Sequence, residues 1–151
     1  MNMETKFFGE IEFSEEDIIH FKQGLPGFRE ETQFLYLTPS DSKFSCLQSV
    51  KTREVAFITI SPFIVCSDYD FELDDDLAAE LGLSTPEEAM VLAIVTVPPG
   101  EPKKATVNLQ APVVLNLHKK TGCQVIINDL RYPLRLPLWK EENVETTAGV
   151  K

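Results

Sequence analysis

Alternation of apolar and polar residues with a period of two dominates the chain and predicts β-strands. After Gly9, Ile11 and Phe13 fall on one face, and Glu10 and Glu12 fall on the other. Many short strands separated by turn residues are typical of sandwiches and barrels, so we expect a mainly β, barrel-like antiparallel domain. The other candidate strands are residues 34–38, 44–50, 55–60, 91–97, 105–109, 113–118 and 124–128, with turn chemistry at 119–122.

Two of these runs, 91–97 and 113–117, are apolar on both faces. An open sheet would leave one face wet, so we expect the sheet to close on itself or to be covered. One or two short helices should accompany it. Residues 74–82 have acids in the first turn and Gly82 at the end, which is the pattern of a capped helix. Thr85 and Pro86 begin a second short turn.

The length of 151 residues suits one domain. Residues 140–151 are polar and offer little to bury, so we expect a domain over 1–139 and a flexible acidic tail over 140–151. No apolar run approaches the 18 residues or so of a membrane helix, and the start lacks the apolar core of a signal peptide. The cytoplasm is the expected compartment.

The formal net charge of −10 argues against direct binding to nucleic-acid phosphates or anionic lipid. An acidic chain still reaches nucleic acid indirectly, by binding a basic protein. The three cysteines and two histidines are scattered and form no C-x-x-C pair. We therefore expect neither a metal nor another cofactor.

Six acids fall within nine residues: Asp68, Asp70, Glu72, Asp74, Asp75 and Asp76. A calcium loop would need glycine where Leu73 stands and a closing glutamate where Ala79 stands. General acid–base chemistry would need a buried carboxyl, which nothing in this stretch indicates. A negative patch for a basic partner, or a solvated helix start, remains as the interpretation of this cluster.

Two other segments have defined local chemistry. Residues 24–28 place two glycines around a proline, which predicts a rigid turn with positive φ angles. Asn108 and Asn116 lie among strand residues and need hydrogen-bond partners, either in a network around a bulge at Pro112 or in recognition of a ligand.

Six short motifs occur in order along the chain: Phe21-x-x-Gly24-Leu25-Pro26-Gly27-Phe28, Phe44-x-x-Leu47-Gln48-Ser49, Ala56-Phe57 before Pro62-Phe63, Asp68-Tyr69, Thr106-x-Asn108-Leu109-x-Ala111-Pro112 with Asn116, and Gly122-x-Gln124-Val125. Taken together, they resemble the flagellar assembly factor family, FliW, from about residue 6 to 132. The resemblance implies a small, monomeric, cytoplasmic barrel that is not an enzyme. It also implies binding to flagellin and to CsrA, an RNA-binding regulator that represses flagellin translation, with antagonism of CsrA by an allosteric route.

Charge and apolar pattern suggest where each partner binds. We expect CsrA to meet the six clustered acids together with Glu141, Glu142 and Glu145 of the tail. We expect amphipathic flagellin segments to meet Phe63, Ile64, Tyr69 and Phe71, where apolar residues alternate with acids outside the obvious core. The alternatives are a barrel that holds a small apolar ligand, a metal-dependent enzyme that uses the acids, and a nucleic-acid mimic.

Overall fold

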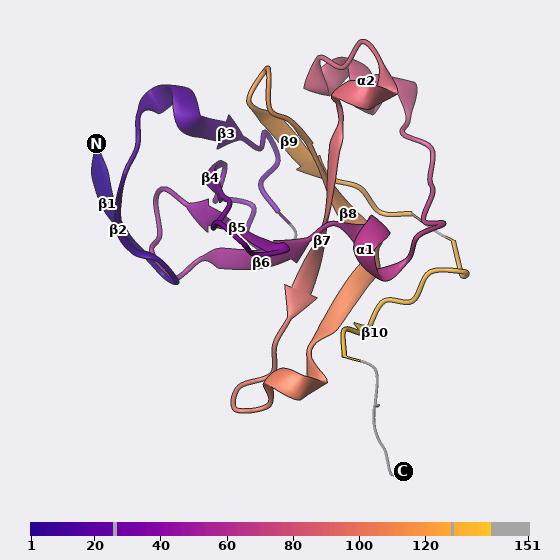
Figure 1. Cartoon of the computed structure of the whole chain (residues 1–151). Helices are drawn as coiled ribbons and strands as arrows, with labels where there is room; N and C mark the ends of the chain where they lie inside the picture. Colours follow the sequence, from indigo (N-terminus) through magenta and orange to yellow (C-terminus); the bar gives the residue numbers. More distant parts are fainter. Residues whose placement is uncertain (26, 128, 140–151) are drawn as a thin grey trace.

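The chain folds into a twisted β-sheet that curls round on itself, with short helices in its connections (Figure 1). The computed structural model describes residues 1–25, 27–127 and 129–139. The strands are β1 (Asn2–Thr5), β2 (Gly9–Glu12), β3 (Ile18–His20), β4 (Gln33–Leu37), β5 (Phe44–Ser49), β6 (Ala56–Ile60), β7 (Met90–Thr96), β8 (Thr106–Asn116), β9 (Thr121–Gln124) and β10 (Leu136–Pro137). The helices are α1 (Pro62–Val65) and α2 (Asp75–Leu81), and the 3-10 turns are η1 (Glu15–Asp17), η2 (Pro86–Glu88) and η3 (Pro102–Lys104).

Within these ranges, seven strands close into a barrel. The order is β8-β7-β6-β5-β4-β3-β9, and β9 pairs back onto β8. Neighbours are antiparallel except β3 and β9, which meet in parallel where His20 pairs with Thr121. β10 pairs with the first residues of β8, and β1 and β2 form a separate hairpin. The expected mainly β, barrel-like domain with short helices is confirmed.

A bulge in β8 explains why its sequence looked like two strands. In β7, Leu92 pairs with Val113 and Ile94 pairs with Asn108, so four residues of β8 stand opposite a single residue of β7. Pro112 lies in this bulge, where its missing N–H breaks no ladder bond. The interpretation of Pro112 as a bulge residue is therefore confirmed.

The predicted strand over 124–128 is wrong in its position. The strand is β9, and it begins at Thr121, which pairs with Asn116, while Gly122 pairs with Leu115. Thr121 and Gly122, two of the four residues assigned to the turn at 119–122, are therefore in the ladder. The turn is made by residues 117–120, in which Lys120 takes the left-handed φ of 59°.

The barrel wall is apolar on both faces because each face packs against its own core. Phe21, Phe34 and Leu47 are among the residues that fill the interior, which argues against the alternative of a barrel holding a small ligand inside. A second core lies on the outside of β6, β7 and β8, where Tyr69 and Tyr132 pack over the strands. The sheet is thus both closed and covered.

The predicted turn at residues 24–28 has the expected geometry. Gly24 and Gly27 have φ angles of 65° and 85°. A Cβ on Gly24 would lie 2.6 Å from the Phe28 carbonyl oxygen, whereas a Cβ on Gly27 would meet no atom within 4 Å. Glycine at position 24 is therefore required both by its conformation and by the close approach of the chain.

No helix within the described ranges is long and apolar enough to cross a membrane. The longest, α2, has seven residues and lies at one end of the molecule, while η3 lies at the other end in the β7–β8 connection (Figure 1).

Candidate functional site

Three of the four apolar residues and three of the six clustered acids singled out in the sequence meet at one groove on the outside of the barrel. This groove has a volume of about 840 Å³. Phe63 comes from α1, Phe71 from the segment after it, and Ala78 from α2, while Val91 and Val114 come from β7 and β8. We call it the acid-rimmed groove, and its other lining residues are Tyr69, Asp70, Glu72, Leu73, Asp75, Ala79, Leu83, Ser84, Thr85, Pro86 and Ala89.

Local sequence places α2 beside this groove. The Asp74 carboxylate accepts a hydrogen bond from the Asp76 backbone N–H at 2.8 Å and caps the helix. Gly82 ends the helix with a φ of 75° and donates to the carbonyls of the last turn. The helix predicted over 74–82 is confirmed, and its acidic first turn lies along the groove.

Asn116 fastens the end of α2 to the barrel. Its side chain is 1% exposed, and its amide donates to the Leu81 carbonyl at 2.9 Å. Its Oδ1 accepts from the backbone N–H groups of His118 and Lys119. Asn108, in contrast, accepts only from the backbone of Gln110 in the bulge at 2.9 Å. Asn116 therefore belongs to an internal network, whereas Asn108 is half-buried and supports the bulge locally.

Tyr69 supports the groove from below. Its side chain is 4% exposed, so the expectation that it lies outside the core is not met. Its hydroxyl donates to the Leu109 carbonyl at 2.6 Å, and burial raises its pKa above the ordinary value. The ring packs on Tyr132 at 4.6 Å and on Phe63 and Phe71 at about 6 Å between centroids. Phe63, which is 47% exposed, presents apolar surface in the groove.

All six clustered acids are exposed, but only three of them line the groove: Asp70, Glu72 and Asp75. Asp68 accepts a hydrogen bond from the Cys66 thiol, and Asp74 acts as the helix cap. Among the described residues, none of the six takes part in an ion pair. The groove therefore has an apolar floor beneath a rim of free carboxylates.

Some predicted contact residues lie elsewhere. Ile64 is 54% exposed on α1, but it does not line the groove. Glu141, Glu142 and Glu145 are outside the described residues. Leu83 and Pro86 also line the groove, and the sequence did not point to them, because their segment looked only like the start of a short helical turn.

The arrangement suits binding better than chemistry. In the described part of the chain, no three His, Cys, Asp or Glu side chains gather as they would around a metal ion. Burial raises the pKa of the Cys46 and Cys123 thiols to about 11, which keeps both protonated near neutral pH. An exposed apolar floor with a charged rim is the usual form of a protein-docking surface.

Comparisons with known proteins give matches that cover almost the whole chain. A family model described as "FliW protein" matches residues 2–138. A protein named "Flagellar assembly factor FliW" from Clostridium novyi is 41% identical over 142 residues, which are 93% of this chain and 99% of that protein. The protein of the same name from Caldicellulosiruptor bescii is 38% identical over 141 residues, covering 93% and 92%. A structure titled "Crystal structure of the flagellar assembly factor FliW" superimposes with a TM-score of 0.86 at 38% identity, covering 94% of this chain and 99% of that one.

Proposed function

The chain belongs to the FliW family of flagellar assembly factors, which are not enzymes, and from that premise we propose that it is a protein-binding regulator that holds flagellin and CsrA in its acid-rimmed groove. In this proposal it acts in the cytoplasm as a monomer. It binds CsrA at a site away from the RNA-binding surface of CsrA. This sequestration relieves the repression of flagellin translation.

One observation carries the proposal: the apolar and acidic residues predicted for two partners converge on one groove. Phe63 and Phe71 lie within the same groove as Asp70, Glu72 and Asp75. An amphipathic segment of flagellin suits the apolar floor, and a basic RNA-binding protein suits the carboxylate rim. Because the two footprints lie in the same groove, we expect the two partners to exclude each other.

The first experiment tests the floor. Phe63→Asp places a charge on an exposed residue of the groove, and Ile126→Asp does the same at a residue that is 63% exposed away from it. Calorimetric titration with purified flagellin should show loss of binding for the Phe63 variant alone. Unchanged flagellin affinity in that variant would remove the groove from the proposal.

The second experiment tests the rim. Asp70→Asn, Glu72→Gln and Asp75→Asn together should weaken CsrA binding by about 1–2 kcal/mol, or roughly 5- to 30-fold, at low ionic strength. The matched control neutralises three exposed acids on another part of the chain, Glu10, Glu15 and Glu16. The dissociation constant of the unmodified chain should rise with salt. A salt-independent constant would show that electrostatics does not drive binding.

The tail acids are tested in the same titration. Replacing Glu141, Glu142 and Glu145 with glutamine in the full chain should weaken CsrA binding further if the tail contributes to the footprint. An unchanged constant would confine the footprint to the groove.

A further inference from the structure

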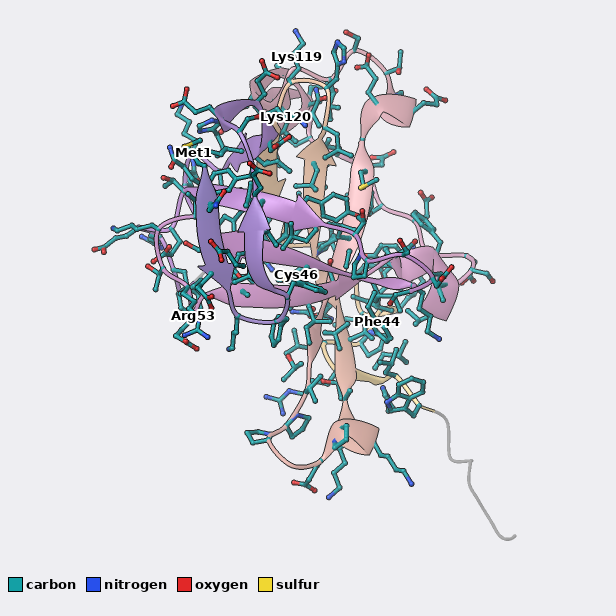
Figure 2. The ribbon with its side chains drawn as sticks, turned by 60° about the vertical axis from the view of Figure 1, so that its left-hand side comes forward. Met1, Phe44, Cys46, Arg53, Lys119 and Lys120 are labelled. Carbon is teal, nitrogen blue, oxygen red and sulfur yellow. The ribbon has the colours of Figure 1, made fainter. Side chains whose placement is uncertain are left out.

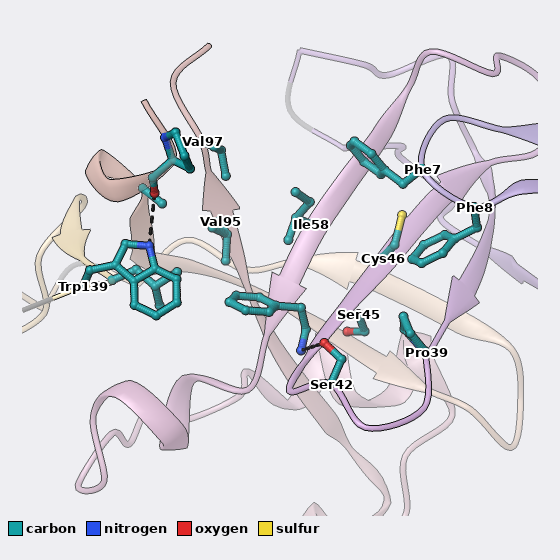
Figure 3. Close-up of a pocket in the computed structure, with 14 residues that line it drawn as sticks. Phe7, Phe8, Pro39, Ser42, Ser45, Cys46, Ile58, Val95, Val97 and Trp139 are labelled. Atoms are coloured by element: carbon teal, nitrogen blue, oxygen red, sulfur yellow. Dashed lines mark hydrogen bonds between the residues drawn. The ribbon is translucent and has the colours of Figure 1, made fainter. Parts of the chain in front are cut away.

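A second groove lies on another part of the outer surface and shares no lining residue with the acid-rimmed groove. It has a volume of about 380 Å³. Its floor is the outer face of three barrel strands, at Cys46, Ile58 and Val95 (Figure 3). Figure 2 shows Cys46 next to the β1–β2 hairpin, with Phe44 farther from the hairpin. We call it the hairpin groove.

The hairpin groove lies between two segments that pack on the outside of the barrel. On one side the β1–β2 turn brings Phe7 and Phe8, fixed by a hydrogen bond from the Lys6 backbone N–H to Gln48. On the other side stands Trp139, whose indole N–H donates to the Pro102 carbonyl at 3.1 Å. Figure 3 shows Phe7 and Phe8 facing Trp139 across the floor.

The surface of the hairpin groove is apolar and exposed. Phe7, Phe8, Val97 and Trp139 are each 40–45% exposed, although they come from three separate parts of the chain. The hydroxyl of Ser45, which also lines the groove, is already bonded to Thr59 at 2.6 Å. The groove thus gathers exposed apolar side chains on one patch, and the Ser45 hydroxyl already has its hydrogen-bond partner. Such a patch indicates a docking surface for apolar side chains.

Two lysines stand over the aromatic walls of this groove, although the whole chain carries a charge of −10. The Lys43 ammonium lies 5.5 Å from the Trp139 ring centroid, and the Lys6 ammonium lies 5.4 Å from that of Phe7. Among the described residues, neither lysine is in an ion pair.

We propose that the hairpin groove binds an acidic amphipathic segment of a second protein. Apolar side chains of that segment fill the space between the two aromatic walls, and its carboxylates face Lys6 and Lys43. Since lysines border this groove, carboxylates border the other, and the two share no lining residue, the chain can hold this partner while a basic partner occupies the acid-rimmed groove.

Trp139 is the only tryptophan of the chain, so its fluorescence reports directly on this groove. The probe is an 18-residue synthetic peptide with leucines at helical i, i+3, i+4 spacing and glutamates elsewhere. The control peptide carries lysine at every glutamate position. The glutamate peptide should shift the Trp139 emission saturably, with an affinity that falls as salt is added. The lysine peptide should cause no shift.

Variants locate the binding. Val97→Glu should weaken the glutamate peptide at least tenfold, and Lys43→Glu should transfer preference to the lysine peptide. Leu130→Glu, at a residue that is 95% exposed outside both grooves, and Phe63→Asp, in the acid-rimmed groove, should leave peptide binding unchanged. If flagellin and CsrA do not bind the acid-rimmed groove, the result with the glutamate peptide is therefore unaffected.

Three peptide results would overturn the proposal: the absence of a saturable shift, equal binding of both peptides, and insensitivity to Val97→Glu. Evidence for another occupant of the groove would also overturn it. Concentration-dependent association in sedimentation, abolished by Val97→Glu, would assign the groove to a second copy of the chain. Peptide binding that requires deletion of residues 140–151 would assign it to the chain's own acidic end.

Discussion

Replacing Asn116 with alanine should detach α2 from the barrel and destabilise the whole domain. The buried carboxamide makes three hydrogen bonds: one at 2.9 Å to the Leu81 carbonyl and two at 3.1 Å from the backbone of His118 and Lys119. Alanine removes all three and keeps the strand backbone of β8. The perturbation is therefore confined to the link between the helix end and the β8–β9 turn.

The size of the effect follows from these bonds. Each intramolecular hydrogen bond contributes about 0.5–1.5 kcal/mol, so the loss should be about 3 kcal/mol. The Leu81 carbonyl keeps a partner, because the Thr121 hydroxyl donates to it at 2.8 Å. Against a typical stability of about 5–15 kcal/mol this loss is large, and it corresponds to a fall in melting temperature of about 6–12 °C.

Urea unfolding followed by circular dichroism measures the loss, and Thr121→Val provides the matched control. The control removes one bond to the same carbonyl and should cost about 1 kcal/mol. Amide hydrogen exchange at His118 and Lys119 should also accelerate in the Asn116→Ala variant beyond the global change. If this variant loses no more stability than Thr121→Val, the carboxamide does not fasten the helix and the reasoning is refuted.

Three further predictions concern the rest of the domain. A hydrogen bond from Ser49 lowers the pKa of the Glu31 carboxyl below its ordinary value, so the ionised form stabilises the fold at neutral pH and this stabilisation is lost as the pH falls through the lowered pKa. Glu31→Gln should cost about 1.5–3 kcal/mol at pH 7, and the difference in urea stability should shrink as the pH falls through the lowered pKa; a constant difference would contradict this. Gly27→Ala should cost about 1–2 kcal/mol for its left-handed φ alone, and Gly24→Ala clearly more because its Cβ meets the backbone; equal losses would disprove the close approach. Cys46, 1% exposed, should react with a thiol reagent only on unfolding, and rapid labelling in native buffer would be inconsistent with its burial.

The features that were predictable from sequence are those fixed by neighbouring residues. The limits of α2 follow from the Asp74 cap and the left-handed Gly82. The turn at Gly24 follows in the same way from local backbone geometry. Each depends on atoms a few residues apart, so a pattern along the chain is sufficient evidence.

Features that depend on tertiary contacts were missed or misplaced. Tyr69 sits between acids and looked like a surface residue, yet it is buried because Tyr132, far along the chain, packs on its ring. The hairpin groove has Lys6 over one wall and Lys43 over the other, and only the folded barrel brings these two lysines to one groove. A net charge of −10 describes the average surface and conceals such a local reversal.

The bulge in β8 connects the fold to the acid-rimmed groove. Without the bulge, successive side chains of β8 would alternate between the two faces of the sheet along the whole strand. Val107 and Val113 would then face the same side of the sheet. With it, Val113 packs inside the barrel and Val107 packs in the outer core. The bulge also frees the Leu109 carbonyl from the ladder to accept the Tyr69 hydroxyl, and Tyr132 in turn accepts a bond from the Asp70 backbone. The irregularity is therefore what holds the acidic segment against the barrel, so loss of the bulge should disorganise the groove before it opens the barrel.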